Sequence, residues 1–239
     1  MTIRLSPDAR EYWRMGPIVL NATIVFTWAV MALLVVGSWL VTRWLEVRPE
    51  RARWQSLLEA AVSFMRAQIR DLSQQDPLPY LPFIGTLFLF ISISNLLAPV
   101  PGYEPPTGSL STSAALAICV FVAVPAYNIA REGLVAYLRH FIEPTPFILP
   151  FQIISEVSRT IALAVRLFGN VLSATLLASI LLSLVPLVVP TVLDVLGLVI
   201  GQIQAYIFAV LALVYIVSAS RAQEGADISA AGEGAGEAS

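Results

Sequence analysis

Long apolar stretches separated by short polar segments make up most of the chain. They run over about residues 16–41, 82–100, 111–129, 150–186 and 191–218. A helix rises about 1.5 Å per residue, so about 20 apolar residues cross the hydrocarbon core of a bilayer. The pattern therefore predicts an all-α, polytopic membrane protein with about five transmembrane helices.

The segment of about residues 50–72 has a different pattern. Its apolar residues, such as Trp54, Met65 and Ile69, recur at helical spacing, and charged residues fill the positions between them. This is typical of a helix with one apolar face, and the segment is too polar to span a membrane. We expect a helix that lies along the membrane surface.

Residues 1–220 are expected to form a single membrane domain, which is followed by a polar tail. The first apolar stretch is longer than the apolar region of a signal peptide and lacks a small-residue cleavage site, so we expect it to stay as a span. Residues 221–239 are rich in Ala, Gly, Glu and Ser without apolar periodicity. We expect them to form a disordered cytoplasmic tail.

Composition supports the membrane assignment and excludes other classes. Hydrophobic residues are 57% of the chain and charged residues 13%, which is too apolar for a soluble domain of this length. The net charge of -2 argues against a nucleic-acid partner. The single cysteine, Cys119, forms neither an internal disulfide nor a thiolate metal cluster. We expect no metal and no cofactor.

Arginine placement predicts the orientation. The segments that follow the first and third spans are rich in arginine, whereas the loop after the second span has none. Positively charged loops stay in the cytoplasm. With five crossings, the N-terminus is then outside and the C-terminus cytoplasmic.

Four ionisable residues lie in the last two apolar stretches: Glu156, Arg159, Arg166 and Asp194. Such residues are costly in lipid and are candidates for function. Arg166 lies deep in its stretch and has no acid three or four residues away. Because a guanidinium stays charged, Arg166 must meet water or a carboxylate of another chain.

A polar stripe surrounds this arginine. Helical rotation places Arg159, Arg166, Asn170 and Ser173 close to one line along the helix. Glu156 is one turn from Arg159, and their pair is either a packing contact at the helix end or part of the function.

The last stretch carries a strip of small residues. Gly197, Gly201 and Ala205 recur every four residues, which allows another helix to approach closely. Gln204 flanks this strip. Asp194, near its start, is either an interfacial carboxylate or part of an aqueous channel.

Two motifs carry a family resemblance. The run Arg159-Thr-Ile-Ala-Leu-Ala-Val-Arg166-Leu-Phe-Gly-Asn170 resembles the signature of subunit a of F-type ATP synthases, as does Gln204-Ala-Tyr-Ile-Phe208. The segments that begin at Pro82 and Pro144 are similar to earlier landmarks of that family. Together the matches cover residues 54–216 in family order.

The resemblance implies a function and partners. Arg166 would face a rotating ring of c subunits, drive ion release from the ring carboxylate and separate two half-channels. Asn170, Gln204, Ser173 and Arg159 would support it, and the last two helices would be long and tilted against the ring. The partners implied are the c ring, the b subunits of the peripheral stalk and the remaining synthase subunits, in the plasma membrane of a bacterium. Such a subunit has no catalytic site of its own.

The chain departs from the family pattern where channel acids are usual. Thr175, Ser109 and Gly197 stand at positions where many members have an acid or a histidine. Together with Glu156, Thr175 and Ser109 stay candidates for the half-channels, and our hypothesis is that Asp194 takes over the outer relay. We expect protons to be the coupling ion; sodium, as in a divergent or sodium-linked branch, is the alternative.

Three other classes of function fit the sequence less well. A secondary transporter should have two related halves, and none is visible. An assembly factor has no need of an arginine at mid-membrane. An intramembrane enzyme would need a catalytic constellation that the spans do not contain.

Overall fold

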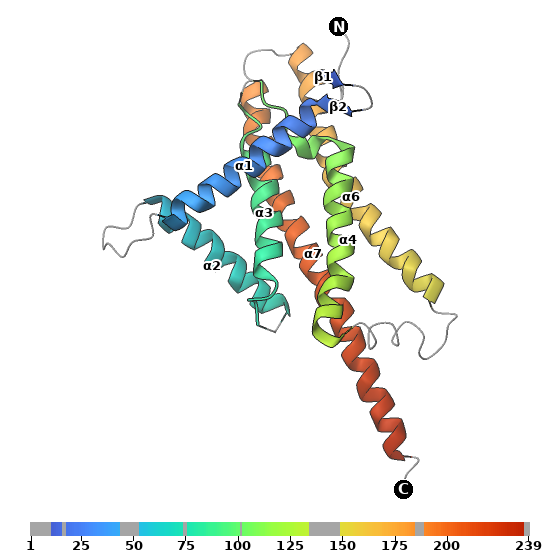
Figure 1. Ribbon diagram of the computed structural model, residues 1–239. Coiled ribbons are helices and arrows are strands. Elements are labelled where there is room, and N and C mark those ends of the chain that lie inside the picture. Colours follow the sequence, from blue (N-terminus) through green and yellow to red (C-terminus); the bar gives the residue numbers. More distant parts are fainter. Residues whose placement is uncertain are drawn as a thin grey trace.

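The computed structural model describes residues 11–15, 18–43, 53–73, 76–100, 102–133, 149–184 and 189–236. Its elements are the strands β1 (Glu11–Met15) and β2 (Ile18–Asn21), the short 3-10 helix η2 (Pro106–Gly108), and the α-helices α1 (Ala22–Arg43), α2 (Arg53–Ser73), α3 (Leu81–Leu96), α4 (Leu110–Glu132), α6 (Leu149–Leu184) and α7 (Val189–Gly236) (Figure 1). The arginine-rich segment that follows the third predicted span, with the landmark that begins at Pro144, lies mostly outside the described residues.

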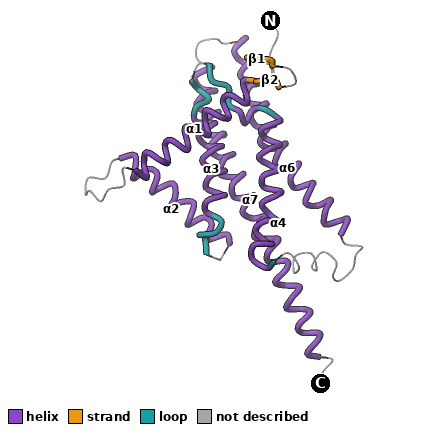
Figure 2. The backbone as a smooth tube through the Cα atoms, viewed as in Figure 1, coloured by secondary structure: helices purple, strands orange, loops and turns teal. Residues whose placement is uncertain are grey.

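A bundle of α3, α4, α6 and α7 forms the body of the molecule (Figure 1). Helix α3 packs against α7, α4 packs against α6, and α6 also contacts α7. Helices α1 and α2 lie to one side of the bundle, and both contact α3. The tube in Figure 2 shows that the described chain is helical apart from the strands near its start and the connecting loops and turns.

The membrane spans agree with the apolar pattern. Within the described ranges, four segments are long and apolar enough to cross a bilayer: Ala22–Leu40, Leu110–Ala130, Ile153–Leu177 and Val195–Ser218. Helix α3 is equally apolar but has 16 residues, a length of roughly 24 Å. The expected polytopic helical fold is confirmed.

The first span begins later than the sequence predicted. Residues 16–41 were expected to be helical, but the helix begins at Ala22, after an antiparallel pairing of β1 with β2. The dipeptide Gly16-Pro17 separates the two strands in the sequence and is typical of turns. Hydrophobicity alone does not distinguish a short apolar strand from a helix.

The last helix continues beyond its apolar part. Helix α7 runs to Gly236, whereas disorder was predicted from residue 221. No proline follows Pro190, and alanine and glutamate, both good helix formers, are frequent in the extension. In Figure 1 this part of α7 projects beyond the bundle.

The core lies between the helices of the bundle, and α2 contributes to it. Large side chains from each of these helices are fully buried there, among them Ile69, Ile84, Val120, Leu167 and Phe208. The amphipathic pattern of α2 is confirmed, because its apolar residues Met65 and Ile69 face this core. A hydrogen bond of 2.7 Å from the Tyr206 hydroxyl to Gln68 Oε1 joins α7 to α2.

Candidate functional site

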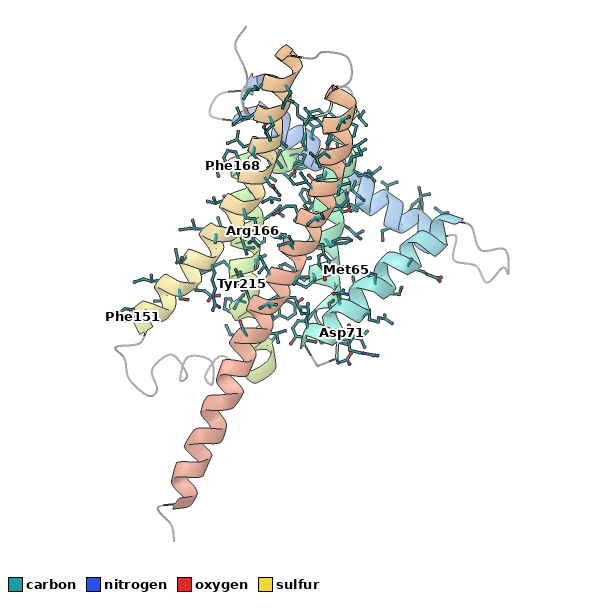
Figure 3. The ribbon with its side chains drawn as sticks, turned by 180° about the vertical axis from the view of Figure 1, so that it is seen from behind. Met65, Asp71, Phe151, Arg166, Phe168 and Tyr215 are labelled. Atoms are coloured by element: carbon teal, nitrogen blue, oxygen red, sulfur yellow. The ribbon has the colours of Figure 1, made fainter. Side chains whose placement is uncertain are left out.

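Arg166 lies midway along α6, on a face that the rest of the described chain leaves exposed (Figure 3). Leu163 and Leu167 point into the core, and helical rotation places Arg166 roughly 80° away from them, on the flank of this buried face. Val165 beside it is 56% exposed, and Ile161 is similarly exposed. Within the described ranges Arg166 forms no ion pair with an acid. A permanent positive charge therefore lies exposed on α6, with apolar side chains on its flank.

One turn from Arg166, α6 and α7 are joined by two amides. Asn170 Nδ2 donates a hydrogen bond of 3.0 Å to Gln204 Oε1. Gln204 is only 3% exposed, and its Nε2 has no hydrogen-bond partner in the described part of the chain. A buried amide donor normally has a partner, so Nε2 points to an acceptor that the chain does not supply, such as water.

Helices α3 and α7 approach each other closely at Gly201. Asn95 Nδ2 donates a hydrogen bond of 2.9 Å to the Gly201 carbonyl oxygen. A Cβ atom placed on Gly201 would lie 2.8 Å from Asn95 Cβ, which is closer than carbon atoms pack. One residue on, Gln202 Nε2 donates a 3.0 Å hydrogen bond to the Ser92 carbonyl oxygen. The predicted close approach therefore occurs at Gly201.

The same asparagine links the bundle to η2. Thr107 Oγ1 donates to Asn95 Oδ1 at 3.0 Å, and Ser113 Oγ donates to the Thr107 carbonyl oxygen at 3.0 Å. Ser109 is buried, and its side chain caps the start of α4 by accepting from the Ser111 amide at 3.2 Å. These bonds fix the position of the loop that enters α4.

A cavity of about 380 Å³ lies between this loop, α6 and α7. Its polar lining residues are Asn95, Tyr103, Glu104, Asn170, Ser173, Thr175 and Gln204. Gly197 and Gly201 form part of its wall on α7. At Gly197 an added Cβ atom would meet no atom within 4 Å, so this glycine leaves the cavity open. The cavity extends from the loop after α3 to the two amides one turn from Arg166.

The structure brings together part of the residue set that the sequence predicted. Asn170, Ser173, Thr175 and Gln204 meet at the cavity, although the Thr175 hydroxyl also contacts the Leu172 carbonyl oxygen at 2.9 Å. The Asp194 backbone lies in α7, one turn before Gly197, but its side chain is outside the described residues.

Glu156 and Arg159 lie elsewhere, toward the start of α6. They form the predicted ion pair, at 3.9 Å. The Arg159 guanidinium also lies 5.4 Å from the centre of the Tyr215 ring. This group is separate from the cavity, about two to three turns from Arg166 toward the opposite end of the helix.

Glu104 is a cavity residue that sequence reasoning missed. It is in a loop between two spans, where an acid is ordinary and no periodicity indicates its direction. The one available signal was that this loop, rich in proline and glycine, contains a single acid and no arginine.

Comparison with known proteins decides the family. The sequence model of the family described as ATP synthase A chain matches residues 24–217. The chain belongs to this family. It is 57% identical over 220 residues to "ATP synthase subunit a 1" of Crocosphaera subtropica, covering 92% of this chain and 96% of that protein. It is 54% identical over 222 residues to "ATP synthase subunit a" of Albidiferax ferrireducens, covering 93% and 96%.

The relative from Chlorobaculum parvum, also named "ATP synthase subunit a 1", is 55% identical over 222 residues, covering 93% of this chain and 98% of that protein. Subunit a of ATP synthase is a component of the ion-translocating membrane sector and not a catalytic subunit. The apolar helices and the bacterial relatives agree with a multi-pass membrane protein of this kind.

Proposed function

We propose that Arg166 is the fixed charge that releases the coupling ion from the carboxylate of a c-subunit ring. The observation that supports this is an exposed arginine midway along an apolar helix, without an acidic partner in the described chain. A ring carboxylate crosses lipid only when a bound ion neutralises it. Beside Arg166 its ionised form is stabilised, so the carboxylate releases its ion there.

In this proposal the cavity is the outer half-channel. It extends from the loop at Glu104 to Asn170 and Gln204, which hydrate and orient the groups near Arg166. Thr175 lies in its wall, and Asp194 stays our candidate for an outer relay because its backbone is close to that wall. Glu156 and Arg159, at the other end of α6, serve the cytoplasmic side.

The ring packs against the exposed apolar face of α6 and α7. Val165 of α6 and Ile203 of α7 belong to this face, and both are more than half exposed in the isolated chain. The b subunits and the other synthase subunits cover further surfaces. By the distribution of arginine, the N-terminus is outside and the C-terminus cytoplasmic.

Disulfide cross-linking tests the position of the ring. In the assembled complex, Val165→Cys is expected to form a cross-link with a cysteine placed next to the ring carboxylate, because both would lie at the level of Arg166. Native Cys119, exposed on α4, is a control within the same chain and should give no cross-link. A cross-link from Cys119 and none from position 165 would place the ring on α4 and contradict the proposal.

We propose protons as the coupling ion. ATP added to proteoliposomes of the holoenzyme should then quench a pH-sensitive dye without sodium, and a protonophore should abolish the quenching. Sodium is the alternative, favoured by the amide and hydroxyl oxygens that line the cavity. Sodium-dependent hydrolysis, together with uptake of radioactive sodium that persists when a protonophore is present, would establish this alternative.

A further inference from the structure

We propose that Glu104 supplies the negative charge that draws the coupling cation, a proton or a sodium ion, into the outer end of the cavity. This rests on the proposed function of the cavity as a half-channel. Glu104 is half-buried and lines the cavity wall. It is the only acid among the described lining residues.

The fold fixes Glu104 at this place. Gly102, with a φ of 87°, reverses the chain in a conformation that other residues rarely adopt. The Tyr103 amide donates to the Val100 carbonyl oxygen at 3.0 Å, and the Tyr103 ring packs 5.0 Å from the ring of Phe26 in α1. Pro105 then leads into η2, which is bonded to Asn95. Glu104 therefore extends from a turn that is held on both sides.

A polar path leads from Glu104 to the region of Arg166. Asn95, Thr175 and Ser173 line the cavity between the loop and the Asn170–Gln204 pair. The unpartnered Nε2 of buried Gln204 at the inner end requires an acceptor, which indicates that water enters this far. Cations that enter from Glu104 thus meet oxygen ligands and water along the wall.

The charges of the cavity explain why an acid is needed at its mouth. Arg166 is a permanent cation one turn from the inner end, and it repels any cation that approaches. Burial raises the pKa of Tyr103 to about 12, so its phenol stays neutral during ion transport. A carboxylate in the wall of a mainly apolar cavity raises the local concentration of cations and offsets this repulsion.

The test is the ion dependence of ATP synthesis in proteoliposomes of the holoenzyme, with the cavity side facing the lumen. Glu104→Gln is expected to raise the apparent KM for the lumenal coupling ion about three- to tenfold. The maximal rate at saturating ion, and the KM for the ion on the other side, should stay close to wild type. Glu59→Gln, which removes an exposed acid of α2, is the matched control and should leave both KM values unchanged.

Charge is separated from shape with a cysteine at the same position. Glu104→Cys, in a chain that also carries Cys119→Ser, is modified after assembly with sulfonatoethyl or trimethylammonioethyl methanethiosulfonate. The negative adduct is expected to return the KM toward wild type, and the positive adduct to raise it further. Because labelling follows assembly, a folding defect of the variant does not enter this comparison.

Equal KM values for the two adducts, or a wild-type KM in Glu104→Gln, would overturn the inference. The proposed function has its own readout in the same assay, since it requires Arg166→Ala to abolish transport. If Arg166→Ala abolishes transport and Glu104→Gln changes nothing, only the role of Glu104 is wrong. If Asp194→Asn raises the KM and Glu104→Gln does not, Asp194 holds that role.

Discussion

Replacing Arg166 by alanine is expected to abolish ion-coupled ATP synthesis while the subunit still assembles. Without the guanidinium, an ionised ring carboxylate in the membrane loses its stabilising partner, at a cost of several kcal/mol. An increase of about 3 kcal/mol in the activation free energy of a step already slows that step on the order of 100-fold. The measurement is ATP synthesis and ATP-driven ion uptake in proteoliposomes, with the amount of assembled complex determined in the same preparation.

Assembly should survive this substitution because Arg166 contributes little to the folded chain itself. Its side chain is exposed and forms no ion pair within the described residues, whereas its neighbours Leu163 and Leu167 hold α6 in the core. Arg66→Ala, which removes an exposed arginine of α2, is the control and should retain coupling. Coupled synthesis at more than about a tenth of the wild-type rate in Arg166→Ala would refute the proposed mechanism.

Arg166 could be singled out from the sequence because the energetic cost of an arginine in lipid is visible there. An arginine within a long apolar run, without an acid one turn away, has no local explanation. The lengths of the apolar stretches predicted the membrane spans, because each spanning helix must cross the same hydrocarbon thickness. These features depend on single segments and are independent of how the segments pack.

Features that depend on packing were harder to predict. The hydrogen bond between Asn170 and Gln204 joins residues 34 positions apart. Glu104 lines the same cavity as Thr175 and Gly197 only because the loop after α3 lies against α6 and α7. A loop has no periodicity that could indicate which of its residues faces a cavity.

The ends of the chain were predicted least well because local preferences there are ambiguous. The residues before Ala22 are apolar enough for either a span or a strand, and the structure has β2. Beyond residue 221, a composition typical of disorder also contains the alanine and glutamate that favour a helix, and α7 continues to Gly236. The glycine strip was predicted as a unit, but Gly201 and Gly197 have different surroundings.

Alanine substitutions at these two glycines are expected to have different effects on stability. In Gly201→Ala, the new methyl group would lie 2.8 Å from Asn95 Cβ and 3.0 Å from Asn95 Cγ. Overpacking of this kind typically costs about 1–3 kcal/mol. Displacing Asn95 would also weaken its hydrogen bonds to Gly201 and Thr107, which adds on the order of 1 kcal/mol for each.

Gly197→Ala is the matched control, in the same helix and with the same added atom. No atom lies within 4 Å of the new Cβ, and alanine is a better helix former than glycine by about 0.5–1 kcal/mol. Thermal denaturation of the purified subunit in detergent, followed by loss of the monodisperse peak, measures both changes. Gly201→Ala should lower the midpoint and Gly197→Ala should keep or raise it. If both variants shifted the midpoint in the same direction, the prediction that the close contact at Gly201 limits the packing of α3 against α7 would be wrong.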